Sequence, residues 1–170
     1  MVEPAAAAQD RLQPSLLDRL IDDAPQQQRE GDAQRVLTRA ALRAAVLRDL
    51  GWLLNATSLG LEAGEFSAPN AARSVLNFGL PMLSGQYTAS LQRAGLERAL
   101  KTAIATFEPR ILPRTLEVEV AMEGAALDSH NCIGLNVRGM LWAQPVPVEF
   151  LMRSRVDLEE GRIQMLGAST

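Results

Sequence analysis

The spacing of the apolar residues changes in the last third of the chain, and no other feature of the sequence constrains the fold as much. Up to Phe107, apolar side chains recur three or four positions apart, which is typical of amphipathic helices. Between Thr115 and Val120 they alternate with acidic residues, and the alternation returns around Leu135 and again around Phe150. Helices followed by strands indicate an α+β fold, with N-terminal helices packed on a largely antiparallel β-sheet formed mainly by the C-terminal third.

Single residues mark the ends of the predicted elements. Ser15 can cap a short helix, and a longer helix is expected from Asp32 onward. A third helix is expected to end at about Phe107, because Pro109 disfavours helical angles at the residue before it. Gly161 is placed at the turn of a terminal hairpin. The side chains expected to face inward are Leu37, Ala40, Ala41, Ala44, Leu47 and Leu50 on the long helix, and Leu96, Leu100, Ala103, Ile104 and Phe107 on the third.

The chain divides into a flexible N-terminal tail with a short amphipathic helix, residues 1–31, and a single α+β domain, residues 32–170. The chain has 170 residues, 47% of them apolar, which is enough to form one hydrophobic core. Four apolar side chains of the tail share one helix face, namely Leu16, Leu17, Leu20 and Ile21. That face has to be covered. The short helix therefore either folds back on the domain or docks on another protein.

The inventory of reactive residues argues against several classes of function. One cysteine, Cys132, and one histidine, His130, cannot supply a disulfide, a multi-ligand zinc site, an iron–sulfur centre or a c-type haem. The formal net charge of -3 gives no bulk attraction to nucleic acid. We therefore expect no cofactor, no metal and no nucleic-acid partner. Neither a leader peptide nor an apolar run of spanning length is evident, so we expect a cytoplasmic protein without direct membrane insertion.

The corner formed by Glu108, Pro109 and Arg110 is the main candidate site. Proline fixes the backbone there, while the two flanking side chains offer charge-assisted hydrogen bonds. These bonds serve either a partner protein or an internal brace of the corner. Catalysis by Glu108 is the less favoured alternative, because an arginine partner lowers the pKa of a carboxyl group and a general acid needs the opposite shift. We also expect Arg110→Glu to leave the fold intact.

Four segments in succession resemble the TssE family of bacterial type VI secretion systems and, more distantly, the small baseplate wedge protein of contractile-tailed phages. The segments begin with Ser15-Leu16-Leu17-Asp18-Arg19-Leu20 and Leu50-Gly51-Trp52-Leu53-Leu54-Asn55. They continue with Ser74-Val75-Leu76-Asn77-Phe78-Gly79-Leu80-Pro81 and Phe107-Glu108-Pro109-Arg110-Ile111-Leu112. The strand-rich end of the chain agrees with the resemblance, which covers nearly all of the sequence beyond the tail.

The resemblance implies a structural, non-enzymatic role in a baseplate at the cytoplasmic face of the bacterial inner membrane. It implies TssF, TssG and TssK as wedge partners and assigns baseplate assembly to Glu108, Pro109 and Arg110. It also implies help in starting the contractile sheath of TssB and TssC, for which strand addition at a free sheet edge, expected around residues 146–166, is physically suited.

Two other functions stay open at this point. The family is often labelled lysozyme-like, so a peptidoglycan hydrolase of the baseplate is one alternative, with Glu108 as its acid. The other is a free adaptor that binds a helical partner through the amphipathic N-terminal segment.

Overall fold

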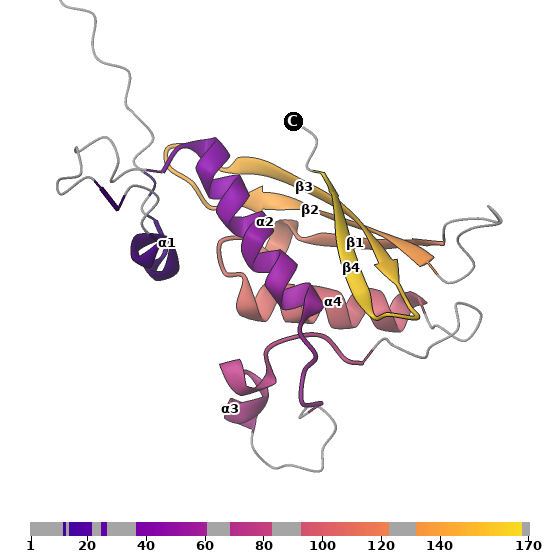
Figure 1. The fold of residues 1–170 in the computed structure, drawn as a ribbon. Coiled ribbons are helices and arrows are strands. Elements are labelled where there is room, and N and C mark those ends of the chain that lie inside the picture. Colours follow the sequence, from indigo (N-terminus) through magenta and orange to yellow (C-terminus); the bar gives the residue numbers. More distant parts are fainter. Residues whose placement is uncertain are drawn as a thin grey trace, which may run out of the picture.

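A computed structural model describes residues 12, 14–21, 25–26, 37–60, 69–82, 93–122 and 132–167. Its centre is a four-stranded antiparallel sheet in the order β1-β2-β3-β4, and two long helices lie against this sheet (Figure 1). The strands are β1 (Glu117–Met122), β2 (Cys132–Leu141), β3 (Val148–Asp157) and β4 (Arg162–Gly167). The long helices are α2 (Arg39–Asn55) and α4 (Arg93–Phe107), and the short ones are α1 (Leu16–Leu20) and α3 (Pro69–Ala72). The α+β prediction is confirmed.

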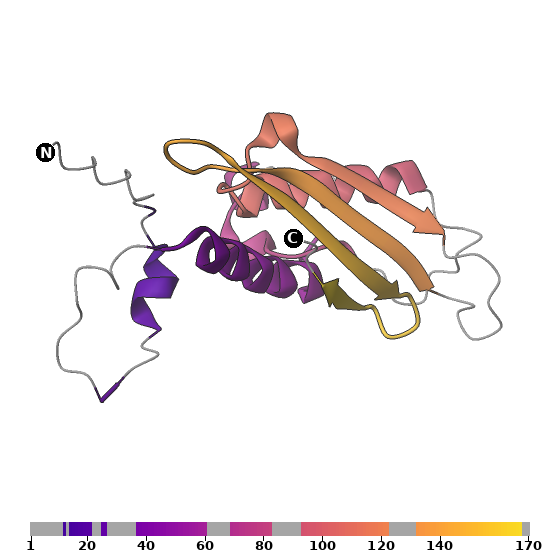
Figure 2. The same cartoon turned by 90° about the horizontal axis from the view of Figure 1, so that it is seen from above.

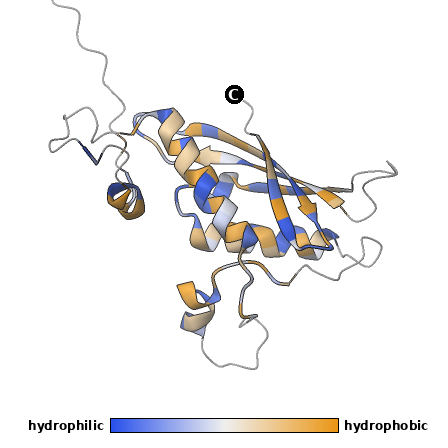
Figure 3. Ribbon diagram, in the orientation of Figure 1, coloured by the Kyte–Doolittle hydropathy of each residue, from blue (hydrophilic) through white to orange (hydrophobic). Residues whose placement is uncertain are grey.

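The core lies between the sheet and the two long helices. Along β2 and β3 buried residues alternate with more exposed ones, as the sequence period requires. Figure 3 shows the same alternation in hydropathy along the strands, and Figure 2 shows the sheet spread over α2 and α4. Each fully buried aliphatic or aromatic side chain contributes about 1.5–3 kcal/mol. The largest of them are Phe150, Leu50, Leu53, Leu80, Leu100, Ile104, Ile111, Leu116, Ile133, Leu135, Leu141 and Met152.

The start of α2 differs from the prediction. The helix begins at Arg39 rather than Asp32, and the hydroxyl of Thr38 caps it by accepting from the N–H of Ala41 at 3.1 Å. Both residues are common N-caps and aspartate is the more favoured of the two, so side-chain preference does not explain the start at Thr38. The buried face is also different, because alanines and leucines occur all around this helix. It consists of Leu42, Ala45, Val46, Leu50, Leu53 and Leu54, which share only Leu50 with the predicted stripe.

The end of α4 and the terminal turn are confirmed. The helix finishes at Phe107, and the predicted inward residues Leu96, Leu100, Ala103 and Ile104 are buried. Phe107 itself is half-buried and packs edge-to-face on Phe78, with ring centroids 5.3 Å apart. Gly161 turns the chain between β3 and β4 with φ at 66°, a conformation that favours glycine.

Of the described residues before α2, Leu12 belongs to the core. Leu12 is buried, and its carbonyl accepts from the N–H of Leu37 at 2.8 Å. The division of the chain at residue 31 stays a prediction. Within the described ranges, every helix is too short or too polar to cross a membrane.

Candidate functional site at the corner after α4

The predicted corner is fastened to the sheet by its backbone. The N–H of Glu108 still bonds to the carbonyl of Ile104 at 2.8 Å, which is the last helical bond of α4. The carbonyl of Arg110 then accepts from the N–H of Trp142 at 2.7 Å. Ile111 bridges to Leu141 at the end of β2. The backbone on either side of the exposed Pro109 is therefore fixed by both a helix and a strand.

Glu108 is buried at this corner, with only 3% of its surface exposed. Its Oε1 accepts from Arg110 Nε at 2.7 Å and from the backbone N–H of Arg110 at 3.2 Å. Arg110 Nη2 binds the other carboxylate oxygen and also Asp49 of α2. One guanidinium thus joins the corner to a neighbouring helix, and a buried carboxylate is neutralised.

A second arginine extends the contacts to α1. Arg48 donates from Nε to Asp49 at 2.9 Å and from Nη2 to Asp18 at 2.7 Å. Asp18 Oδ2 also lies 3.9 Å from Arg110 Nη1. We call Asp18, Arg48, Asp49, Glu108 and Arg110 the ionic cluster. Its three carboxylates and two guanidiniums connect α1, α2 and the corner, which are far apart in the sequence.

The contacts within the ionic cluster shift the pKa values of Asp18, Arg48 and Arg110. Burial alone raises the pKa of Asp18, but hydrogen bonds from Ser15 and Arg48 outweigh burial and hold this pKa below its ordinary value. For Arg110, burial lowers the pKa, whereas the bonds to Glu108 and Asp49 raise it well above the ordinary value. Burial likewise lowers the pKa of Arg48, but the bonds and charges of Asp18 and Asp49 together outweigh burial and raise this pKa above its ordinary value. All three groups are therefore charged at neutral pH.

Helix α1 is attached through its polar side. Ser15 and Asp18 form a capping box, in which the Asp18 N–H donates to the Ser15 hydroxyl at 3.3 Å and the Ser15 N–H donates back to the carboxylate at 3.1 Å. The apolar face predicted to need cover lies open among the described residues. Its members are Leu16, Leu17, Leu20 and Ile21, which are 76%, 38%, 73% and 42% exposed.

The structure thus brings the two predicted groups of site residues to one place. The corner and the α1 face are linked by Asp18, which belongs to neither prediction. For Asp18, the local signal in the sequence is the Ser-x-x-Asp spacing of a capping box. Arg48 and Asp49 were also not predicted, and their only local signal is that their opposite charges are adjacent. His130 lies outside the described residues. In the part of the chain that the structure describes, no group of acidic, histidine or cysteine side chains could hold a metal ion.

Comparison with known protein families agrees with this architecture. The family model described as baseplate wedge protein gp25 matches residues 40–146, which is more than half of the chain. The chain belongs to this family. No curated protein and no solved structure matches it. The resemblance to the baseplate wedge proteins is confirmed.

The wedge-family match divides the ionic cluster. Arg48, Asp49, Glu108 and Arg110 lie within the matched residues 40–146, whereas Asp18 and all of α1 precede them. The contact between α2 and the corner is therefore part of the matched region. Helix α1 adds a further carboxylate and an apolar face. Membership of the wedge family gives the protein a structural role in a phage-tail-like baseplate, in contact with other baseplate components.

Proposed function

We propose that this protein is the wedge subunit of a bacterial type VI secretion baseplate, with a structural rather than enzymatic role. The wedge-family match over residues 40–146 is the observation that carries the proposal. The four TssE-like segments support the assignment to a secretion system. The proposed partners are TssF, TssG and TssK in the wedge and the sheath subunits TssB and TssC, at the cytoplasmic face of the inner membrane.

The proposed wedge contact consists of α1 and the corner that it adjoins. Three apolar side chains on a helix of five residues, and that of Ile21 directly after the helix, are exposed to water, which is unfavourable for an isolated subunit. Asp18 nevertheless anchors this helix on Arg48, so its position is defined before a partner arrives. The exposed Pro109 lies on the same corner as Arg110. A preorganised apolar helix beside a charged corner suits a protein interface with an apolar centre and a polar rim.

The sheath contact is proposed for the outer edge of β4. Within the predicted range of residues 146–166, β3 is enclosed by β2 and β4 and has no free edge. Among the described strands, β4 pairs with β3 alone, so its other side is where main-chain pairing with a sheath strand would occur.

The geometry gives little support to the hydrolase alternative. A general acid has to present its carboxyl group to substrate, whereas Glu108 is buried and both of its oxygens are bound by Arg110. Purified protein should therefore release no fragments from peptidoglycan sacculi. Turnover that Glu108→Gln abolishes would contradict the structural role.

The wedge contact is tested by recovery of TssF, TssG and TssK on the tagged, full-length protein. The double substitution Leu16→Asp/Leu20→Asp changes two side chains that are 76% and 73% exposed, so the fold should persist. We expect recovery to fall by at least about tenfold, because charges in an apolar interface centre are strongly unfavourable.

The matched control is Val75→Asp/Leu76→Asp, which introduces the same charges at two residues that are 80% and 65% exposed but lie away from α1. This control should recover the partners normally. Equal recovery by both double variants, or equal loss, would show that the α1 face is not the wedge contact.

A further inference from the structure

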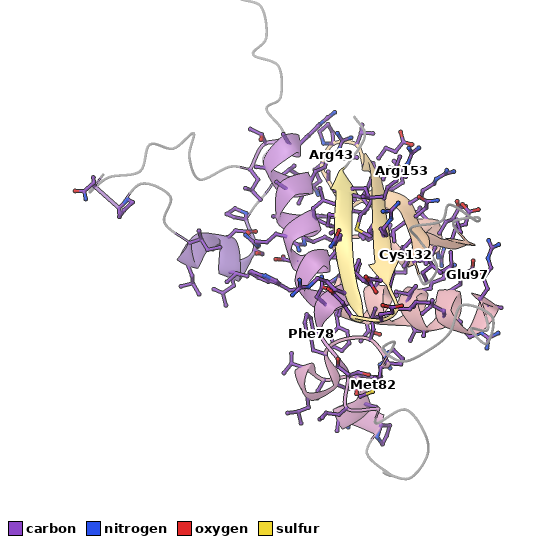
Figure 4. All side chains as sticks on the ribbon, turned by 45° about the vertical axis from the view of Figure 1, so that its right-hand side comes forward. Arg43, Phe78, Met82, Glu97, Cys132 and Arg153 are labelled. Atoms are coloured by element: carbon purple, nitrogen blue, oxygen red, sulfur yellow. The ribbon has the colours of Figure 1, made fainter. Side chains whose placement is uncertain are left out.

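Both edges of the sheet are bound by a side chain from the helix alongside. At β4, Asn55 of α2 accepts from the N–H of Ile163 at 2.9 Å and donates to the carbonyl of the same residue at 3.1 Å. At β1, Glu97 of α4 accepts from the N–H of Val120 at 2.9 Å. Figure 4 labels Glu97 on α4 and shows α2 running beside β4. The backbone N–H and carbonyl groups of an exposed edge strand are normally free to pair with a strand of another chain.

The contact at β4 reproduces what a neighbouring strand would provide. A primary amide carries a carbonyl acceptor and N–H donors, as the peptide group does. Asn55 uses its oxygen and its nitrogen on the two outward groups of a single residue, Ile163. Its second N–H donates to the carbonyl of Gly51 at 2.8 Å, so the amide is held in place by its own helix. Ile163 therefore has no outward backbone group left for an incoming strand.

Met165 is the next residue along β4 whose backbone groups face outward, and no helix side chain of the described residues binds them. Because hydrogen-bonding direction alternates along an antiparallel strand, the N–H and carbonyl of Met165 face the same way as those of Ile163. Neither group bonds to any residue that the structure describes. The strand has neither lysine nor proline, and its one charged residue is Arg162. Its pairing with β3 is regular from Arg162 to Met165, and the register shifts only after Met165. Leu166 beside this position is 59% exposed.

We propose that Asn55 determines which strands β4 accepts, and that it prevents a second copy of this chain from pairing along β4 in the free subunit. With Asn55 in place, a second β4 finds one free outward residue at Met165, which is too little for a stable ladder. With Asn55 removed, Ile163 and Met165 form a continuous edge that a second copy can extend. The proposal concerns the isolated subunit: in the baseplate, a sheath strand would have to displace Asn55 from Ile163 before it could pair along β4. Association of the isolated subunit is measured without sheath subunits, so its failure is distinguishable from failure of the sheath contact.

The first test is the oligomeric state of the full-length protein by sedimentation velocity over a range of concentrations. We expect wild type to sediment as a monomer and Asn55→Ala to associate as concentration rises. Thr102→Ala is the matched control, because it also removes a side-chain bond to a helix carbonyl but lies on an exposed part of α4. Adding Met165→Pro to Asn55→Ala should restore the monomer, since proline removes the remaining outward N–H.

Two results of this test would overturn the proposal. One is an Asn55→Ala protein that sediments like wild type at every concentration while melting cooperatively. The other is association of Asn55→Ala that persists when Met165→Pro is added, because the contact would then not involve the β4 edge.

The second test is amide hydrogen exchange of wild type, which does not depend on whether any variant folds. The Ile163 amide should exchange about tenfold more slowly than the Met165 amide, although both face outward from the same edge strand. Equal exchange at these two positions would mean that Asn55 does not hold the edge in solution, and the proposal would be wrong.

Discussion

Replacing Arg110 by methionine tests whether the corner depends on the ionic cluster. Methionine replaces the aliphatic part of the arginine side chain but carries no guanidinium. Glu108, which is 3% exposed, and Asp49 therefore lose their partner. Breaking a buried ion pair by removing one partner costs about 3–5 kcal/mol. Since the Arg110 side chain is 22% exposed, water can partly replace it, and we expect the lower end, about 3 kcal/mol.

This expectation differs from the one made for Arg110→Glu on sequence alone. The sequence alone treats Arg110 as a surface arginine that contributes little to the core, so reversing its charge is expected to leave the fold intact. The structure instead places a buried carboxylate against Arg110, so Arg110→Glu would bring a further negative charge to Glu108 and Asp49. We therefore expect Arg110→Glu to destabilise the protein at least as much as Arg110→Met.

Urea unfolding measures the effect. With a slope of about 2 kcal/mol per molar, a loss of about 3 kcal/mol lowers the midpoint by about 1.5 M. Glu108→Gln is the comparison variant, because it leaves a neutral group of the same size and keeps Arg110 bound to Asp49. It should cost only about 1–2 kcal/mol. The double variant should cost less than the sum of the two, since each substitution removes the same contact.

Additive effects, or a cost below about 1 kcal/mol for Arg110→Met, would refute the reasoning. Either result would mean that Arg110 does not neutralise Glu108 in the folded protein. The corner would then be held by its backbone bonds to Ile104 and Trp142 alone.

Two further predictions concern α1 and Gly79, which lies against the backbone just after α2. Because the pKa of Asp18 is below its ordinary value of 3.8 in the folded protein, its contribution to docking is complete above that value and is lost as pH falls below it. Limited proteolysis at α1 should therefore be slow at neutral pH and accelerate in this acid range, whereas Asp18→Asn should be cleaved rapidly at every pH. Gly79→Ala should cost about 3 kcal/mol in urea unfolding, because φ is 127° and an added Cβ would lie 2.5 Å from the Ala56 carbonyl oxygen. Gly60→Ala is its control at about 1–2 kcal/mol, since φ is also positive there but an added Cβ would meet no atom of the described residues within 4 Å.

The parts of the fold that the sequence predicts are those set by local chemistry. Alternation along β2 and β3 predicts which residues face the core, because strand side chains point to opposite faces in turn. Pro109 ends α4 through a clash with the residue before it. At α2 the local rules fail, since the cap is Thr38 although aspartate is the stronger N-cap residue, and the apolar residues have no clear phase.

The candidate site shows the same limit. Glu108 and Arg110 are two positions apart, so their pairing at a proline corner follows from the sequence. Asp49 comes from another helix, and only the packing of α2 against the corner places it beside Arg110. The amphipathic pattern of α1 predicts a buried apolar face, yet the helix is anchored through Asp18, which pairs with Arg48 and Arg110, and that face is open.

The sheet edge shows why tertiary contacts have to be known before an interface can be assigned. Period-two alternation is the same for an inner strand and an outer one, so residues 146–166 predict a strand pair without indicating which strand is outermost. The observed order leaves β4 outside and encloses β3. Even then, an outer strand is not a free strand, because Asn55 reaches Ile163 across 108 positions of sequence. The surface that β4 offers to other proteins is therefore determined by the C-terminal turn of α2 as much as by the strand itself.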